Sequence, residues 1–141
     1  IEAMCINIVK QMYKDNFTPD YILGITRGGN IPATIISNML DIPCEAMKIS
    51  FRNDDKQEDH WLSQKIMDKN ILIVDDINDT GATLQGIHDI VVMEGMADNV
   101  KYITLFDKLS SNFGEVEITA KELDEVEEKQ WIVFPYEEWW K

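Results

Sequence analysis

The residues best suited to chemistry form one short string, Val-Asp-Asp-Ile-Asn-Asp-Thr-Gly-Ala-Thr, at positions 74–83. Asp75 and Asp76 stand at the end of an apolar run, and a third acid, Asp79, follows three residues after Asp76. Carboxylates accept hydrogen bonds from sugar hydroxyls and are oxygen ligands for Mg²⁺. We therefore expect Asp75 and Asp76 to face a sugar or to lie near a phosphate-bound Mg²⁺, and Asp79 to meet the reacting group.

The Thr-Gly-Ala-Thr end of this string is suited to hold an anion. It is predicted to begin a helix, where free N–H groups and the positive end of the helix dipole attract phosphate. The hydroxyls of Thr80 and Thr83 add donors, and Gly81 lets the backbone approach a ligand. The four residues of this predicted cup are Thr80, Gly81, Ala82 and Thr83. In a plainer interpretation, Asp79 or Thr80 only caps a helix behind a strand that ends in two acids.

Three other classes of phosphate-handling site do not fit the sequence. A P-loop needs GxxxxGK[ST], and the chain has no Gly-Lys pair. A dinucleotide fold needs GxGxxG, which the run from Gly28 to Asn30 does not provide. A phospho-receiver domain carries its paired acids on its first strand, with a longer chain still to follow than the one that follows Asp76.

Apolar residues recur in patterns that alternate between helix and strand. Helices are predicted over 1–16, 32–40 and 81–94, and strands over 21–25, 46–51, 70–76 and 100–106. This alternation is typical of an α/β fold with a mostly parallel central sheet and helices on both faces. Ligands bind beyond the carboxyl ends of such strands, the edge predicted for both glycine turns, 26–30 and 79–83. From residue 112 onward the alternation stops, and the acidic run 115–128 is expected to be a solvated face.

Composition limits the functions that are possible. The 141 residues are enough for one domain, and 45% hydrophobic with 28% charged residues indicates a globular protein. A net charge of −13 argues against nucleic-acid or anionic-membrane binding. The sequence shows no membrane-spanning segment and no signal peptide, so a cytoplasmic location is expected. Cys5 and Cys44 match no metal spacing and are predicted to be buried free thiols.

The string at 74–83 resembles the signature of the type I phosphoribosyltransferases, which bind 5-phosphoribosyl-1-pyrophosphate (PRPP). Three other segments agree with this resemblance. Residues 26–29 are similar to the family's pyrophosphate loop, which often contains a cis peptide, and residues 50–61 match its flexible loop in position. The tail 131–140, with Lys108 upstream, resembles the base-recognising end of the purine branch.

The resemblance implies a role for each matching residue. Asp75 and Asp76 would face the ribose hydroxyls, and the cup would hold the 5′-phosphate. Asp79 would act at N7 of the purine as the catalytic residue, and Lys108 would donate to the exocyclic oxygen at position 6. The remaining implied contacts are Thr26, Arg27, Gly28 and Gly29 for pyrophosphate, Ser50, Phe51 and Arg52 in the flexible loop, and Trp131 and Ile132 at the purine.

The implied reaction is purine salvage, in which a phosphoribosyl group passes from PRPP to a 6-oxopurine (hypoxanthine, guanine or xanthine). The implied cofactor is Mg²⁺, held mainly by PRPP with Asp75 and Asp76 nearby, and a homodimer or homotetramer is expected. The resemblance implies a single domain over 1–141, with a flexible loop at about 50–66 and a small hood formed mainly by 112–141. Two alternatives stay open: a non-catalytic PRPP-binding regulator, and a phosphoribosyltransferase for a non-purine acceptor.

Overall fold

The computed structural model describes residues 1–48, 69–124, 126–129 and 132–135. The predicted flexible loop lies outside this part of the chain. So do four of the predicted site residues, Ser50, Phe51, Arg52 and Trp131. Their roles stay predictions.

Five strands form one parallel sheet in the order β2-β1-β3-β4-β5. They are β1 (Tyr21–Ile25), β2 (Cys44–Met47), β3 (Ile71–Asn78), β4 (Val100–Lys108) and β5 (Val116–Leu123). The central strand β3 starts with Ile-Leu-Ile-Val, and these four side chains are buried. A continuous apolar run is what a strand covered on both faces requires. The predicted α/β fold with a parallel sheet is confirmed.

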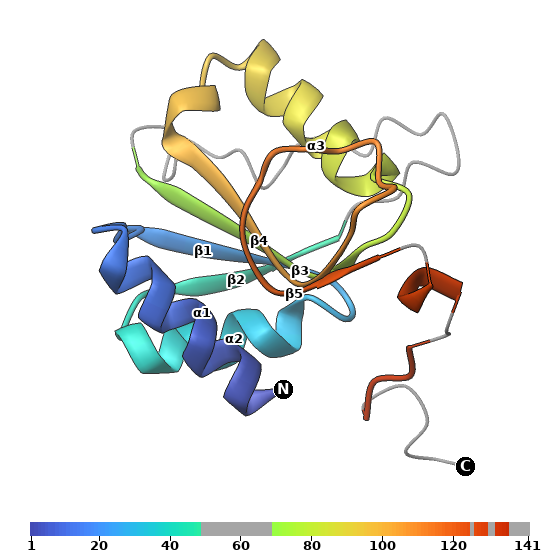
Figure 1. Ribbon diagram of the computed structural model, residues 1–141. Helices are drawn as coiled ribbons and strands as arrows, with labels where there is room; N and C mark the ends of the chain where they lie inside the picture. The colour runs from blue at the N-terminus through green and yellow to red at the C-terminus, as the bar shows by residue number, and fades with distance from the viewer. Residues whose placement is uncertain (49–68, 125, 130–131, 136–141) are drawn as a thin grey trace.

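Helices cover both faces of the sheet, as predicted. The helices α1 (Glu2–Lys14) and α2 (Asn30–Leu40) pack on one face, and α3 (Ala82–Met93) packs on the other (Figure 1). Side chains of β3 alternate between the two cores, with Leu72 packing on the α1 and α2 side and Ile73 on the α3 side. Two short 3-10 helices, Ala97–Asn99 and Glu127–Lys129, complete the described secondary structure. Within the described residues, no helix has the length and apolar character needed to cross a bilayer.

Glycines mark both ends of α3. Gly81 is the N-cap residue with φ 94°, and Gly95, just after the C-cap, has φ 71°. Both angles lie in the left-handed region, where a side chain is strained and glycine is not. The helix predicted over 81–94 therefore begins and ends where the glycines permit it.

The strand order reverses next to β1, since β2 lies on one side of it and β3 on the other. Along the chain, β1 leads into α2 and β3 leads into α3, on opposite faces of the sheet. The two strands pair in parallel as far as Gly24, near the carboxyl end of β1, and Val74, in the middle of β3. The turns that follow them, both predicted to hold ligand, therefore lie side by side at the switch point where α/β sheets bind ligands.

No strand is predicted after residue 106, but Val116–Leu123 forms β5 at the edge of the sheet. Only Ile118 and Leu123 of this strand are buried, and its charged residues Glu117, Lys121 and Glu122 are exposed. A half-buried edge strand with this composition has the same local signal as a solvated acidic segment. Residues 116–123 thus lie in the central sheet, so the acidic run 115–128 is not wholly the solvated face that was expected. The hood stays a prediction.

Two smaller expectations also change. β2 begins at Cys44 rather than at residue 46, and Cys44 is half-buried rather than buried. Cys5 is buried as predicted, and both thiols are free. Burial raises the pKa of Cys5 to about 11 and also raises the pKa of Cys44. Both thiols are therefore protonated and unreactive at neutral pH.

Candidate active site

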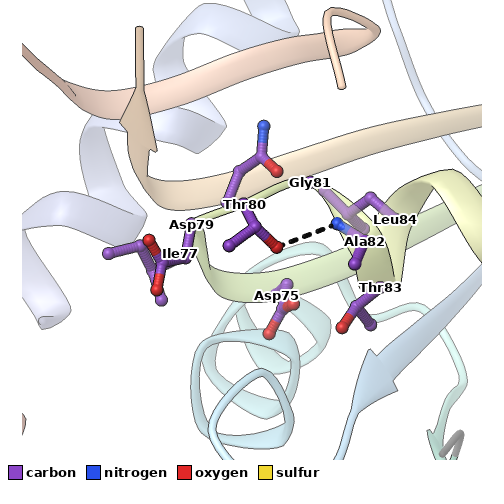
Figure 2. A pocket seen from close by; sticks show the side chains of 9 residues that line it. Asp75, Ile77, Asp79, Thr80, Gly81, Ala82, Thr83 and Leu84 are labelled. Atoms are coloured by element: carbon purple, nitrogen blue, oxygen red, sulfur yellow. Dashed lines mark hydrogen bonds between the residues drawn. The ribbon is translucent and has the colours of Figure 1, made fainter. Parts of the chain in front are cut away.

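A small open pocket lies where β3 leads into α3 (Figure 2). The side chains of Asp75, Thr80 and Thr83 surround it, and the Thr80 hydroxyl oxygen accepts a hydrogen bond from the amide of Ala82 at 3.2 Å. Its lining residues are Asp75, Ile77, Asn78, Asp79, Thr80, Gly81, Ala82, Thr83 and Leu84. The structure thus brings the whole predicted phosphate cup together with one of the two predicted sugar-facing acids.

Asp75 and Asp76, in the second half of β3, accept hydrogen bonds from the backbone of the residues that follow them. Asp75 Oδ1 accepts a hydrogen bond from the amide of Asp76 at 2.8 Å, and Asp76 Oδ1 accepts one from the amide of Ile77 at 2.8 Å. Burial, and then the neighbouring Asp76 carboxylate, raise the pKa of Asp75 well above its ordinary value. A ligand that donates hydrogen bonds to Asp75 would favour its charged form and relieve this unfavourable setting.

The turn after β1 contains a cis peptide between Thr26 and Arg27, a feature that the family resemblance implied. The amide and the hydroxyl of Thr26 both donate to the carbonyl of Met47, at 2.8 and 3.1 Å, and tie this turn to the end of β2. Arg27 is exposed beside it. Its guanidinium is therefore available to an anion at the sheet edge.

Two glycines of this turn lie against the end of β3. A Cβ atom on Gly28 would stand 1.9 Å from Asp76 Oδ2, and one on Gly29 would stand 2.4 Å from the carbonyl oxygen of Val74. At Gly29 a Cβ atom would meet backbone, whereas at Gly28 it would meet only the Asp76 side chain. The predicted pyrophosphate loop and the predicted sugar-facing acids therefore form one continuous surface.

Lys108 and Asp79 meet at the ends of β4 and β3. Lys108 Nζ donates to Asp79 Oδ1 at 2.5 Å, with the Lys108 side chain 19% exposed and that of Asp79 59% exposed. The Lys108 side chain is thus largely buried, whereas the Asp79 carboxylate is largely exposed to solvent. The predicted base-contacting lysine and the predicted catalytic acid thus form one ion pair next to the phosphate cup.

The described part of the tail packs on the α1 and α2 core. Phe134 is 4% exposed and its ring meets that of Phe106 with centroids 5.7 Å apart, and Ile132 is half-buried against the same core. This packing fixes Ile132 against the core on the α1 and α2 side of the sheet. Its predicted contact with a purine stays a prediction.

Sequence reasoning missed Asn78, the last residue of β3. Its side chain is 1% exposed and hydrogen-bonds to Asp107, Ser111 and Phe113. The signal in the sequence is a polar amide that stands directly before Asp79, in the string at 74–83, and to which neither the predicted cup nor the predicted acids assign a role.

Comparison with known proteins points to one family. Residues 1–139 match the family described as the phosphoribosyl transferase domain. Xanthine phosphoribosyltransferase 1 of Saccharomyces cerevisiae is 30% identical over 110 residues, which are 60% of this chain and 53% of that protein. A xanthine-guanine phosphoribosyltransferase of Cereibacter sphaeroides is 28% identical over 130 residues, 87% of this chain and 72% of that protein. The chain thus spans only about half the length of the yeast relative.

Solved structures agree with this assignment. A purine phosphoribosyltransferase from Pyrococcus horikoshii superimposes with a TM-score of 0.72 at 28% identity, covering 97% of this chain and 88% of that one. A Neisseria gonorrhoeae protein solved with bound ppGpp reaches a TM-score of 0.78 at 18% identity, covering 96% of this chain and 84% of that one, and shows the fold alone. With a matching family over nearly its whole length and the type I fold in its sheet, the chain belongs to the phosphoribosyl transferase domain family.

Proposed function

We propose that this protein transfers the phosphoribosyl group of PRPP to N9 of a 6-oxopurine, giving the nucleoside 5′-monophosphate and pyrophosphate. The names of the curated relatives support the purine as acceptor. The observation that carries the proposal is the Asp79–Lys108 ion pair beside the phosphate cup. A purine bound there would meet both a carboxylate, which can accept a proton, and an ammonium group, which can donate to an oxygen.

The cup and the two acids suit the sugar half of PRPP. The 5′-phosphate is expected at the start of α3, where free amides and the Thr80 and Thr83 hydroxyls can donate to it. Asp75 and Asp76 would accept hydrogen bonds from the ribose hydroxyls. Holding both features of the sugar fixes C1′ relative to the sheet edge, which is the positioning part of catalysis.

The turn after β1 suits the leaving group. As the bond from C1′ to the pyrophosphate oxygen breaks, positive charge develops on the sugar and negative charge on pyrophosphate. Arg27, exposed on the turn that follows β1, is a donor at this edge of the sheet that could meet that negative charge. The pyrophosphate leaves with the electron pair of the broken bond.

The Asp79–Lys108 pair suits the purine. A 6-oxopurine protonated at N7 must lose that proton when N9 bonds to C1′, and we assign Asp79 as the group that receives it. Lys108 carries only hydrogen-bond donors, so it would bind the exocyclic oxygen at position 6 and not an amino group. Adenine should therefore be refused.

Mg²⁺ fits this site as an ion that arrives with PRPP. Within the described residues, no group of three or more acidic, histidine or cysteine side chains could hold a metal alone. Two carboxylates at the end of β3 match the one or two that Mg²⁺ commonly takes from a protein when phosphate oxygens supply the rest. When bound, the ion would neutralise charge on the pyrophosphate.

The proposal also includes a cytoplasmic homodimer or homotetramer. The family resemblance supports this part, together with two neighbouring tryptophans near the end of the sequence, Trp139 and Trp140, which suit an interface. Sedimentation of the purified chain at micromolar concentration measures the oligomeric state directly.

The test of the activity is pyrophosphate release from PRPP and Mg²⁺ with hypoxanthine, guanine, xanthine, adenine, uracil and orotate. Turnover with at least one 6-oxopurine and none with adenine is the expected result. Binding of PRPP without turnover on any base would contradict the proposal and favour a regulator. Turnover only with a pyrimidine would assign another acceptor.

A further inference from the structure

The connection between β4 and β5 is unusual for parallel strands. Such connections normally take about a dozen or more residues and contain a helix, whereas residues 109–115 join these two strands without one. Figure 1 shows this segment in orange, passing over the sheet on the side of α3. Phe113 anchors its middle in the core beneath α3. A short segment without internal helix hydrogen bonds needs other contacts to fix it.

The connection 109–115 packs against the Thr80–Gly81 part of the phosphate cup. The amide of Asn112 donates to the carbonyl of Thr80 at 3.0 Å. A Cβ atom on Gly81 would stand 2.6 Å from the Phe113 amide nitrogen and 2.7 Å from Ser111 Oγ. The cup therefore cannot keep its shape if this connection moves.

Asn78 links the connection 109–115 to the strands β3 and β4. Its Nδ2 donates to Asp107 Oδ1 at 2.9 Å and to the carbonyl of Phe113 at 3.0 Å, and its Oδ1 accepts from Ser111 Oγ at 3.0 Å. One buried side chain thereby links the end of β3, the end of β4 and the connection 109–115. Asn78 also stands directly before Asp79, and Asp107 directly before Lys108.

We propose that Asn78 is a positioning residue, which fixes the phosphate cup for PRPP by holding the connection 109–115 against it; this rests on the proposed function. The contacts require an amide. Both donors of Nδ2 face oxygen acceptors, so an aspartate at this position would set a carboxylate against the Asp107 carboxylate and the Phe113 carbonyl. The shape would be kept and the hydrogen-bond pattern reversed.

The test compares Asn78→Asp with Asn78→Asp/Asp107→Asn and with Asn38→Ala, an exposed asparagine on α2. The dissociation constant for PRPP with Mg²⁺ is measured by calorimetry, and KM and kcat are measured on the base that turns over. We expect Asn78→Asp to raise Kd and KM for PRPP about tenfold with kcat within about threefold, as a buried hydrogen-bond partner is lost. The double variant should recover part of this loss, because the amide introduced at position 107 can donate to the carboxylate introduced at position 78. Asn38→Ala should match the wild type.

A purely structural role would lower the folded fraction, and with it kcat, while KM stayed unchanged; that result would overturn the proposal. An unchanged Kd in a folded Asn78→Asp variant would overturn it too. If Asn78→Asp does not fold, Ser111→Ala removes one contact of the same amide and should raise KM for PRPP about threefold. Binding of PRPP by the wild type without turnover overturns only the proposed function, whereas absence of binding overturns both.

Discussion

At the residue scale, the ion pair between Asp79 and Lys108 partly neutralises both groups before any substrate is present. Lys108 is largely buried by its surroundings, and Asp79 is largely exposed. A purine that enters between them replaces the Asp79–Lys108 contact with two others. Lys108 then donates to the purine oxygen, and Asp79 accepts from the protonated ring nitrogen. The two residues should therefore fail in different ways when each is replaced.

Asp79→Asn should lower kcat by roughly 10²–10⁴-fold, the range typical of a lost general base, because an amide cannot take the purine proton. KM for PRPP should change by less than about threefold, since Asp79 has no role in the cup. Steady-state kinetics with varied PRPP measures both values. Near wild-type turnover in Asp79→Asn would remove this residue from the mechanism.

Lys108→Ala should raise KM for the base by about 10-fold or more, because a charged hydrogen bond to the exocyclic oxygen at position 6 is lost. Lys101→Ala is the matched control, since Lys101 lies at the opposite end of the same strand, over the ring of Phe17. KM for each 6-oxopurine is measured for both variants. Equal effects of the two substitutions, or an unaltered base preference, would reject the assigned contact.

Asp75→Asn should stabilise the ligand-free protein at pH 7. Burial and the Asp76 carboxylate raise the pKa of Asp75 in the folded state, so the folded chain binds this proton more tightly than the unfolded chain. Asp75 therefore favours folding less as pH rises from its ordinary pKa of 3.8 through the raised folded value. Asparagine removes the charge and keeps the acceptor for the Asp76 amide.

The measurement is the melting temperature of Asp75→Asn against wild type from pH 4 to pH 8. The advantage of the variant should grow with pH, while its affinity for PRPP falls. Asp98→Asn, at an exposed aspartate in the 3-10 helix Ala97–Asn99, is the control and should show no such trend. A destabilised Asp75→Asn variant at pH 7 would mean that the charged form is the favoured one.

At the element scale, the approach of the turn after β1 to the end of β3 predicts a contrast between two neighbouring substitutions. Gly29→Ala should lower the free energy of unfolding by about 1–3 kcal/mol, because its Cβ would meet the carbonyl oxygen of Val74, which cannot move without the strand. Gly28→Ala would meet only the Asp76 side chain. It should cost less stability and more PRPP affinity.

Urea denaturation and PRPP calorimetry on the two variants separate these effects. If Gly28→Ala is the less stable variant, or if it binds PRPP as the wild type does, the two turns do not form one site.

Most elements could be predicted from local pattern. The buried run of β3, the glycines that bound α3 and the amphipathic α1 are each encoded within about a dozen residues, and the structure confirms them. The predicted cup and its acids are also defined locally, because they occupy ten consecutive positions, and their roles stay predictions. That these elements should build a parallel sheet follows from their alternation alone.

The parts that could not be predicted depend on partners distant in sequence. β5 is recognisable as a strand only when β4 lies beside it, because the adjacent charged residues Lys121 and Glu122 break the apolar/polar alternation that marks a half-buried strand. The role of Asn78 depends on its hydrogen bonds to Ser111 and Phe113, which are 33 and 35 residues away in the sequence. The Asp79–Lys108 pair depends in the same way on the β3–β4 register, which no pattern within either strand specifies.

At the scale of the whole molecule, the net charge of −13 opposes the approach of a polyanion such as PRPP. Salt screens charges beyond a Debye length of about 10 Å at 0.1 M and leaves short contacts in the site less affected. We therefore expect kcat/KM for PRPP to rise as ionic strength increases from about 10 to 150 mM. A decrease over that range would show that the local positive groups, Arg27 and the helix N-termini, control the encounter.

The pairing of β1 with β3 joins Tyr21 to Ile71. The two turns of the site therefore belong to segments that are distant in sequence, and the first is synthesised well before the second. Neither turn can grip a nucleotide-like ligand until this distant contact has formed, and contacts of high sequence separation form late and slowly. A ligand that bridges both turns binds only the finished fold and raises the free energy of unfolding with its concentration. The supply of PRPP in a cell would then act as a folding aid, and starvation for it would leave more of the newly made chain open to proteases.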